Sequence, residues 1–394
     1  MARFQSSDTM SAQTLTFLLA GGQGSRLFEL TAQTCKPAVC FDGTTRLIDY
    51  TMANIVRSGL TSLVVATQYL GKDVEDHLRK SWAGAFSSGG LDITDGTSPA
   101  FGTDGFRGTA DAVRRNIDLI DKQNPDYILV LAADHIYEMD YRPMIAAHQA
   151  SGACVTIAVD IVPRSEASAF GVIDARADGQ IKHFVEKPKF PPAMKERPDH
   201  CQVSMGIYVL SWDWLRNLLL AQADLHDFGH DVLPVAVAQA RAFAYQPPGR
   251  LPGGRNYWRD VGTLDAFRET ALAFASATPP VPAPFSVLVP DAVLRPLQKS
   301  VAHPYVAGSV LMPGCVVCAS AVLTNCIVMS GCVIPFATVI GEDEAEDRKW
   351  FRRTAGGTTL VSPQMLAKRA QASRFTQASA DQPVPFPSML ENGL

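Results

Sequence analysis

The apolar positions of residues 14–276 form short continuous runs that alternate with amphipathic stretches. The runs predict strands over residues 14–20, 62–67, 127–133 and 155–161. The amphipathic stretches predict helices over residues 47–58, 71–79, 109–123 and 141–150. Strands that are apolar throughout are buried on both faces, as in a parallel sheet covered by helices. The pattern therefore predicts an α/β domain over residues 14–276, whose ligands bind at the carboxyl edge of a mostly parallel sheet.

The pattern changes after residue 276. Residues 277–305 are rich in proline and predict a stiff linker. Beyond it, a period of six predicts a short left-handed parallel β-helix of hexapeptide repeats over residues 306–365. Its predicted inward aliphatic residues are Val310, Val316, Val322, Val328, Ile334 and Ile340. The small residues two places before them are predicted to form the corners: Gly308, Gly314, Ser320, Cys326, Cys332 and Thr338.

The β-helix and the two ends of the chain carry further expectations. The strict repeat supplies about two coils, too few to bury a core alone, so we expect it to dock on the first domain or on another subunit. Residues 1–13 are polar and are predicted to be flexible. Residues 366–394 are rich in Gln, Ser, Ala and Pro and are predicted to be disordered.

Composition narrows the class of protein. The chain has 394 residues, with 35 basic and 39 acidic side chains and a net charge of −4, so no basic surface for nucleic acid is indicated. No apolar run reaches the ~18 residues of a membrane helix, and the N-terminus lacks the apolar core of a signal peptide. Cys315 and Cys318 could form half of a zinc site, but no second such pair follows. We expect a cytoplasmic protein without nucleic-acid or membrane partners.

The strongest chemical signal follows the first predicted strand. There the sequence Leu-Leu-Ala-Gly-Gly-Gln-Gly-Ser-Arg-Leu places Gly21, Gly22 and Gly24 before Arg26. Glycines after a strand let backbone N–H groups approach a phosphate, and arginine adds a charged donor fork. Leu27 stands where a dinucleotide fingerprint has its third glycine, and no Walker lysine follows. The segment therefore predicts a phosphate-binding loop that is neither a dinucleotide fingerprint nor a Walker loop.

Two carboxylates are candidates for a metal site. Asp134 ends the apolar run 127–133, where a magnesium ligand would meet substrate oxygens. The alternative, a helix cap, is better filled by Asp140, and His135 is interpreted as a packed polar residue. Asp260, in Trp-Arg-Asp-Val-Gly-Thr, is either a second metal ligand or a turn residue, and the pattern alone does not decide between them.

Two lysines could neutralise phosphate charge. Lys36 stands ten residues past Arg26, before a proline, and is a weak signal alone. Lys187 follows Glu186 after an apolar strand and could neutralise a substrate phosphate, although these residues alone favour an exposed ion pair. No Gly-x-Ser-x-Gly motif is present. The chemistry indicated is metal-assisted transfer at phosphorus.

Nine segments in this order resemble the bacterial glucose-1-phosphate adenylyltransferases, from about residue 15 to residue 365. They are LLAGGQGSRL, KPAVCFDG, GTADAVRRN, DHIYEMDY, EASAFGV, FVEKPKFPPAM, SMGIYVL, HDFGHDVLP and YWRDVGTLDAF. The resemblance implies a Rossmann-like nucleotidyltransferase domain followed by a β-helix, assembled as a homotetramer. It also implies that ATP and α-D-glucose 1-phosphate give ADP-glucose and pyrophosphate, for glycogen synthesis.

The resemblance also implies roles for particular residues. Gly21, Gly22, Gly24 and Arg26 would hold the nucleotide phosphates with help from Lys36. Asp134 and Asp260 would bind Mg²⁺, and with Arg26 and Lys187 they form the expected catalytic set. The residues expected to bind the hexose phosphate are Phe106, Gly171, Glu186, Lys187, Ser204, Tyr208, Asp227 and Trp258.

Several positions depart from the family pattern. Phe106 follows Gly105 where the family has Trp-Tyr, Ala133 replaces a glycine, and His230 replaces a lysine. Gln33 stands where regulated relatives carry a basic residue, so we expect a weak response to fructose 1,6-bisphosphate. The alternatives are a sister transferase that uses UTP, dTTP or GTP, a regulatory subunit of the family, and an acyltransferase. A regulatory subunit would be expected to have lost one of the catalytic residues, and all of them are present.

Overall fold

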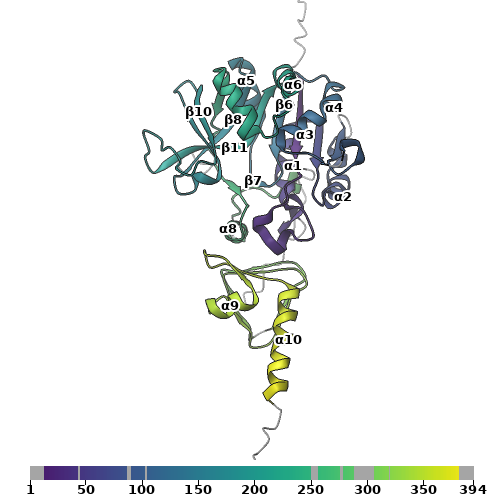
Figure 1. Cartoon of the computed structure of the whole chain (residues 1–394), viewed down its shortest axis with the longest axis vertical. Helices are drawn as coiled ribbons and strands as arrows, with labels where there is room; N and C mark the ends of the chain where they lie inside the picture. The colour runs from purple at the N-terminus through teal and green to yellow at the C-terminus, as the bar shows by residue number, and fades with distance from the viewer. Residues whose placement is uncertain are drawn as a thin grey trace, which may run out of the picture. The chain divides into compact units, whose positions relative to one another are not determined.

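The computed structural model describes residues 13–42, 45–86, 90–102, 104–249, 256–275, 278–287, 306–318 and 320–380. It divides into two compact units (Figure 1). The first comprises Met1–Ala266 with Ser276–Arg295, and the second Phe267–Ala275 with Pro296–Leu394. The predicted flexible N-terminus lies outside the described residues, except for Gln13. Among the described residues, no helix has both the length and the apolar character needed to cross a membrane.

A nine-stranded sheet forms the centre of the first unit, in the order β10-β9-β11-β6-β1-β4-β5, with β8 beside β11 and β12 beside β8. Its strands are β1 (Thr14–Leu19), β4 (Leu63–Thr67), β5 (Leu91–Asp95), β6 (Tyr127–Ala132), β8 (Val155–Pro163), β9 (Gly171–Ala175), β10 (Ile181–Glu186), β11 (His200–Ser211) and β12 (Ala242–Tyr245). Only β10 and β11 run against the others. The mostly parallel sheet predicted from the apolar runs is therefore confirmed.

Helices cover both faces of this sheet (Figure 1). One face packs against α1 (Leu47–Arg57), α2 (Lys72–Ser81) and α5 (Arg142–Ser151). The other packs against α3 (Thr109–Arg115), α4 (Ile117–Asp121), α6 (Trp212–Ala221) and α7 (Leu233–Ala238). Along β1, Leu15 and Phe17 enter one core and Leu18 enters the other, which is why this strand is apolar nearly throughout.

Residues 109–123 form two helices rather than the single one predicted. The break falls at Asn116, whose backbone (φ −106°, ψ 11°) leaves the helical region. Its side-chain amide donates to the carbonyl of Ala112 at 2.8 Å. Asparagine competes in this way with the helical backbone, and an amphipathic pattern does not reveal it.

Short elements complete the first unit. They are β2 (Cys40–Asp42), β3 (Thr45–Arg46), β7 (His135–Tyr137) and β13 (Trp258–Asp260). The short segments of tighter or wider helix are η1 (Ser25–Thr31), η2 (Lys36–Ala38), η3 (Ala83–Phe86), η4 (Pro99–Phe101), η5 (Ala167–Ala169), η6 (Phe228–Val232) and η7 (Pro284–Val287). The helix α8 (Leu264–Phe274) begins in the first unit, and its residues from Phe267 belong to the second.

The proline-rich segment is packed where the structure describes it. Over residues 278–287, Val281 is buried, and Phe285 of η7 stacks on Trp82 with ring centroids 5.3 Å apart. The sequence predicts a stiff linker over residues 277–305, whereas residues 278–287 belong to the first unit. The packing of Val281 and Phe285 accounts for the difference, because removing apolar side chains from water stabilises the packed segment.

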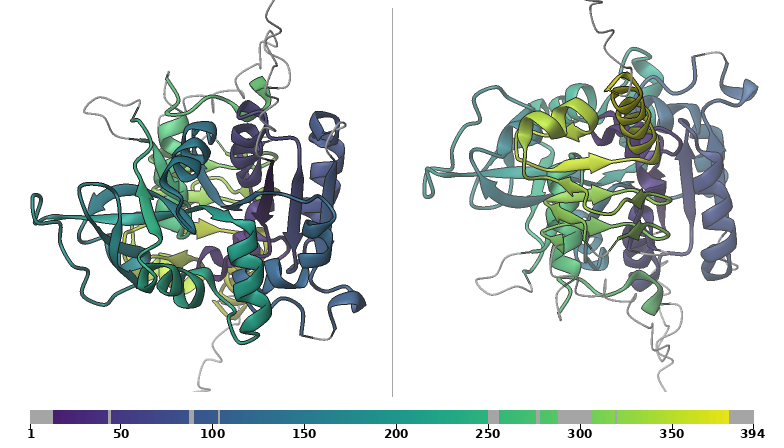
Figure 2. Two further views of the ribbon diagram at one scale, coloured as in Figure 1. Left: turned by 90° about the horizontal axis from the view of Figure 1, so that it is seen from above. Right: turned by 90° about the horizontal axis from the view of Figure 1, so that it is seen from below.

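The second unit is built from short parallel strands stacked in layers (right-hand view of Figure 2). They are β14 (Val306–Ala307), β15 (Val310–Leu311), β16 (Val316–Val317), β17 (Val322–Thr324), β18 (Cys326–Val328), β19 (Val333–Ile334), β20 (Val339–Ile340) and β22 (Thr359–Val361), with β21 (Arg352–Arg353) antiparallel to β22. Helices α9 (Glu344–Trp350) and α10 (Pro363–Ala380) follow β20 and β22. The stacked parallel strands confirm the predicted β-helix.

The register of the β-helix corrects half of the predicted inward set. Leu311 pairs with Val328, Val317 with Ile334 and Leu323 with Ile340, so stacked residues lie 17 positions apart. The inward column therefore begins with Leu311, Val317 and Leu323 in place of Val310, Val316 and Val322. The predicted small positions Gly308, Gly314 and Ser320 are off by one for the same reason.

A five-residue step between Leu323 and Val328 causes this shift. Asn325 turns that corner in the left-handed region (φ 53°), which asparagine tolerates better than most residues. From Val328 onward the six-residue spacing returns. Cys326 and Cys332 are buried in the interior at the small positions.

The predicted disorder of residues 366–394 is wrong for its first part. Helix α10 runs to Ala380, and residues 381–394 lie outside the described residues. Leu366 packs against the core of the β-helix, and the Arg369 guanidinium lies 5.7 Å from the centre of the Phe351 ring. The polar composition suggested disorder, but alanine, glutamine and arginine are also good helix formers.

Candidate active site

Two aspartates meet beyond the carboxyl end of β6. Asp134 lies between β6 and β7, and Asp260 is the last residue of β13. These two short strands pair antiparallel, with Asp260 opposite His135. The buried side chain of Asn54 in α1 fixes the end of β7, because it bonds the Tyr137 carbonyl at 3.0 Å and the Met139 N–H at 3.2 Å. Carboxylates 126 residues apart in sequence are thus held together by backbone pairing.

A buried lysine joins the two carboxylates. Lys36 Nζ lies 2.8 Å from Asp134 Oδ2 and 2.8 Å from Asp260 Oδ1. The lysine begins the turn η2, and its backbone N–H donates to the Gly22 carbonyl at 3.3 Å. A single ammonium between two carboxylates offsets their mutual repulsion and leaves the three side chains with a net charge of −1.

This arrangement sets the charge states of two members. Burial alone would lower the pKa of Lys36, but attraction from Asp134 and Asp260 outweighs it and raises the pKa. Burial would likewise raise the pKa of Asp134, whereas attraction to Lys36 and His135 lowers it well below its usual range. Lys36 is therefore protonated and Asp134 ionised at neutral pH.

The remaining carboxylate oxygens fit a divalent cation. Asp134 Oδ1 lies 3.8 Å from His135 Nε2, and Asp260 Oδ2 lies 3.8 Å from Arg26 Nη2. One ligand atom from each of Asp134, His135 and Asp260 lies within 4.8 Å of the others. Hard divalent cations take carboxylate oxygens and keep open positions for substrate oxygens, so the two aspartates here suit such an ion.

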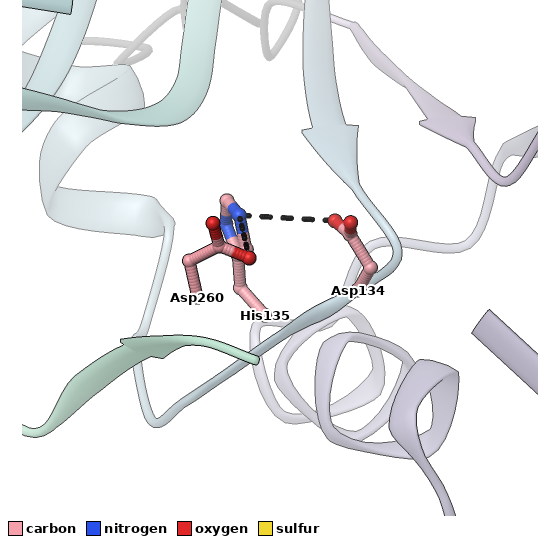
Figure 3. A group of neighbouring side chains, drawn as sticks. All are labelled: Asp134, His135 and Asp260. Atoms are coloured by element: carbon pink, nitrogen blue, oxygen red, sulfur yellow. Dashed lines mark ion pairs between the residues drawn. The ribbon is translucent and has the colours of Figure 1, made fainter. Parts of the chain in front are cut away.

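His135 belongs to this group, although its sequence context favoured a packed polar residue. Its imidazole lies beside both carboxylates, with Nε2 3.8 Å from an oxygen of each (Figure 3). The Trp258 ring meets it edge-on at 5.4 Å. The buried nitrogens His135 Nδ1 and Trp258 Nε1 have no hydrogen-bond partner in the described part of the chain.

The glycine loop approaches this cluster from the end of β1. Gly24 is left-handed (φ 66°), and a Cβ added there would lie 2.7 Å from Cβ of Lys36. Nothing lies within 4 Å of a Cβ at Gly22. The Arg26 side chain is 62% exposed and faces the carboxylates from the first turn of η1. The sequence thus brings the predicted phosphate loop and the predicted metal ligands to one place.

A second group of predicted residues surrounds Glu186, the last residue of β10. Gly171 pairs with it, and a Cβ at Gly171 would lie 2.8 Å from Glu186 Oε2. A Cβ at Gly229 would lie 2.6 Å from the same oxygen. The carboxylate therefore occupies a space that two glycines leave open, and Lys187 Nζ pairs with Oε1 at 3.0 Å.

Lys187 has an unusual backbone. Its φ of 45° is left-handed, a conformation that costs a residue with a side chain about 1–2 kcal/mol, and Pro188 follows it. Its N–H donates to the Phe170 carbonyl at 3.0 Å, and its side chain is 61% exposed. Such strain is typical of functional positions, and here it leaves the ammonium open to an incoming anion.

Ser204, Glu186 and Asp227 all lie near the Tyr208 hydroxyl. The hydroxyls of Ser204 and Tyr208, both on β11, lie 3.4 Å apart. Burial raises the pKa of Tyr208, and Glu186 and Asp227 raise it further, so the phenol is neutral. Asp227 accepts the Thr109 hydroxyl on Oδ2 and the His230 N–H on Oδ1, each at 3.0 Å. Thr109 was not predicted as a site residue.

Two aromatic contacts join the groups. Trp258, beside His135, also packs on Phe170 at 5.0 Å, and Phe170 precedes Gly171 in the chain. A Cβ at Gly206, on β11 between Ser204 and Tyr208, would lie 3.5 Å from the His135 ring. Two groups are therefore neighbours within one unit. The Glu186 group consists of Glu186 with Lys187, Ser204, Tyr208 and Asp227, and the carboxylate cluster consists of Lys36, Asp134, His135 and Asp260.

Phe106 lies on the loop between β5 and α3. Its ring packs on Phe101 at 4.9 Å, and its N–H donates to Gln68 Oε1 at 2.7 Å. Gln68 also touches the glycine loop, because a Cβ at Gly21 would lie 3.3 Å from its Cβ. Gln68 was not predicted as a site residue, although it directly follows β4 at the same sheet edge.

Known protein families and individual proteins match this chain along most of its length. The family described as Nucleotidyl transferase matches residues 15–277, and a family described as GlmU-like, C-terminal hexapeptide matches residues 286–361. A protein of Jannaschia sp. (strain CCS1) named glucose-1-phosphate adenylyltransferase is 39% identical, covering 92% of this chain and 99% of its own.

Relatives from other bacteria carry the same name. One from Cereibacter sphaeroides (strain ATCC 17029) is 37% identical, covering 92% of this chain and 98% of its own. One from Paraburkholderia phytofirmans is 38% identical over 90% of this chain and 97% of its own. The matches span both units, and this chain belongs to the glucose-1-phosphate adenylyltransferase family.

Proposed function

We propose that Lys36, Asp134 and Asp260 form the catalytic centre at which this chain makes ADP-glucose. As a member of its family, the chain transfers the adenylyl group of ATP to glucose 1-phosphate and releases pyrophosphate. The observation that carries the assignment of the centre is the Lys36 ammonium at 2.8 Å from both carboxylates, beside the glycine loop.

The glycine loop and Arg26 would hold the phosphates of ATP. Left-handed Gly24 and the open space at Gly22 allow the loop backbone to approach phosphate oxygens closely. The exposed guanidinium of Arg26 can turn from Asp260, 3.8 Å away, toward an anion. At that distance the pair is weak, so its loss costs little when a phosphate binds.

Asp134 and Asp260 would hold the metal. Nucleotidyltransferases generally use a divalent ion, and we propose Mg²⁺, which favours one or two carboxylates plus substrate phosphates. When bound, the ion would offset negative charge on the reacting phosphates. Lys36 keeps the two aspartates together beforehand, so little reorganisation is needed during the reaction.

The Glu186 group would hold glucose 1-phosphate. The carboxylates of Glu186 and Asp227 can accept hydroxyls of the hexose, and the exposed ammonium of Lys187 can meet its phosphate. A phosphate oxygen would then attack the α-phosphorus of ATP in line with departing pyrophosphate. Positioning and electrostatics supply most of the catalysis in such a transfer.

A pyrophosphate-release assay with four nucleotides tests this function. With glucose 1-phosphate as the acceptor, ATP is expected to give the highest kcat/KM, followed at a distance by UTP, dTTP and GTP. A clear preference for UTP, dTTP or GTP would favour a sister transferase. Release of no pyrophosphate with any of the four would favour a regulatory subunit.

Two expectations from the resemblance stay predictions. The expected homotetramer is tested by light scattering after size-exclusion chromatography, which should give a mass four times that of the 42.5 kDa chain. The weak response to fructose 1,6-bisphosphate, based on Gln33, is tested by adding the effector to the same assay, where a many-fold activation would contradict it.

A further inference from the structure

Thr109, the first residue of α3, is hydrogen-bonded to the loop that carries Asp227, one of the carboxylates proposed to bind the hexose. Its hydroxyl donates to Asp227 Oδ2 at 3.0 Å and accepts the Phe228 N–H at 3.0 Å. Because a hydroxyl has a single hydrogen, the donor bond goes to the carboxylate. The two residues are 118 positions apart in sequence, so this hydroxyl joins two otherwise distant segments.

The backbone around Thr109 holds the same loop. The N–H groups of Ala110 and Asp111 both donate to the His226 carbonyl, at 2.8 and 3.2 Å. A Cβ at Gly108 would lie 2.3 Å from that oxygen, so only glycine permits this approach. The loop is therefore seated tightly on the start of α3, and the Thr109 hydroxyl is its side-chain contact there.

The position of this loop affects a second carboxylate. Gly229 lies two residues after Asp227, and a Cβ there would lie 2.6 Å from Glu186 Oε2. Asp227 Oδ1 accepts the His230 N–H at 3.0 Å, so the loop turns around the aspartate itself. A shift of Asp227 would therefore carry Gly229 with it and change the space that Glu186 occupies.

We propose that Thr109 is a positioning residue for the hexose pocket: its hydroxyl fixes Asp227 and, through Gly229, the carboxylate of Glu186. This inference rests on the proposed role of the Glu186 group in binding glucose 1-phosphate. Thr109 touches neither Lys36 nor the two metal-binding aspartates in any hydrogen bond of the described residues. Its loss should therefore weaken binding of the hexose phosphate selectively.

The test compares Thr109→Val with Thr109→Ser in the full-length protein. Valine keeps the shape and removes the hydroxyl, so KM for glucose 1-phosphate should rise about tenfold or more. KM for ATP should stay within about twofold, which a general loss of structure would not produce. Serine keeps the hydroxyl and should restore KM for glucose 1-phosphate to within about threefold of the original.

Thr156→Val is the matched control. Thr156 Oγ1 bonds His148 Nδ1 at 2.9 Å in the buried part of β8, so this variant also removes a hydrogen-bonded hydroxyl. Its melting temperature should fall while both KM values stay near those of the unchanged protein. Thr109→Ala gives the same comparison if the valine variant does not fold.

Asp227→Asn separates the inference from the proposed function. If this variant leaves KM for glucose 1-phosphate unchanged, the assigned role of Asp227 is wrong. If it raises KM while Thr109→Val does not, only the role of Thr109 is wrong. Combined, the two substitutions should raise KM little more than Asp227→Asn alone, because they act through one interaction. Fully additive effects, or equal increases in both KM values for Thr109→Val, would overturn the proposal.

Discussion

At the scale of single residues, the site depends on how closely Gly24 approaches Lys36. Gly24 is left-handed, and a Cβ there would lie 2.7 Å from Cβ of Lys36. Two penalties follow for alanine at this position: backbone strain and displacement of the lysine that joins Asp134 to Asp260. The second penalty is specific to the site.

Gly24→Ala is therefore expected to lower both stability and turnover. The left-handed conformation costs about 1–2 kcal/mol for alanine, and a displaced Lys36 should lower kcat about 100-fold. Gly59→Ala is the control, since Gly59 has a similar φ (69°) with nothing within 4 Å of its Cβ. It should lose comparable stability in urea titrations and keep its kcat. Equal kcat for both variants would contradict the role given to the contact with Lys36.

His148 predicts a pH dependence of stability. It is buried between the hydroxyls of Thr156 (2.9 Å) and Ser211 (3.2 Å), and burial lowers its pKa to about 4. An unfolded histidine has a pKa of about 6.5, so between pH 6.5 and 4 the unfolded chain binds the extra proton. Stability from this group is fully present above pH 6.5 and is lost as pH falls, by up to about 3 kcal/mol.

Unfolding measured by urea at several pH values tests this expectation. His148→Gln should flatten the decrease between pH 6.5 and 4, because the amide does not titrate. His183→Gln is the control at an exposed histidine and should leave the decrease intact. An unchanged slope in His148→Gln would show that other groups cause it.

At the scale of elements, the ligand-binding edge of the sheet could be predicted from the sequence. For the β-helix, the sequence predicted the inward positions correctly in only half of the repeat. Continuous apolar runs marked β1 and β6, and the polar residues that follow them fall at one edge by the geometry of parallel strands. In the β-helix, both residues of Val310-Leu311, Val316-Val317 and Val322-Leu323 are aliphatic. A period of six fits either column there, and only the five-residue step at Asn325 selects the second.

A pair of substitutions tests that register. Leu323 is fully buried, whereas Val316, in the column predicted to face inward, is 55% exposed. Leu323→Ala should lower the free energy of unfolding by about 2–5 kcal/mol, and Val316→Ala by no more than about 0.5 kcal/mol. Chemical denaturation measures both. A larger loss for Val316→Ala would restore the strict six-residue register.

Partners distant in sequence were the part of the site that pattern could not predict. The hydrogen bond between Thr109 and Asp227 has no local signature, because it depends on a loop seated on α3. Gln68 and His135 gave some signal, since each follows directly or closely on a strand at the ligand edge. The glycines gave less signal in the sequence. The lack of space for a Cβ at Gly171 and Gly229 becomes visible only when the Glu186 side chain is in place.

At the scale of the whole molecule, the chain enters its second unit earlier than composition suggested. Arg268 of α8 bonds Thr358 Oγ1 at 2.9 Å, the Gly308 carbonyl at 3.0 Å and Asn325 Oδ1 at 3.2 Å. Three separate coils or corners of the β-helix thus depend on a helix that precedes the proline-rich segment. The boundary predicted at residue 276 places this helix in the first domain, whereas contacts divide it.

A fragment of residues 300–365 is therefore expected not to fold alone. It lacks Arg268, whose guanidinium donates hydrogen bonds to the buried Thr358 hydroxyl, the Gly308 carbonyl and Asn325 Oδ1. These three acceptors lose that donor in the fragment. Circular dichroism on heating should show no cooperative transition. A soluble fragment that melts cooperatively would show that the β-helix is self-sufficient.

The steady-state rate of pyrophosphate release by Asp134→Asn, over a titration of Mg²⁺, tests the central claim most directly. The unchanged protein should show saturable dependence on Mg²⁺ with ATP and glucose 1-phosphate. The variant, checked for folding by its melting curve, should lose about 1,000-fold or more of kcat, since one ionised ligand beside Lys36 is gone. Turnover within a few-fold of the unchanged protein would contradict the account.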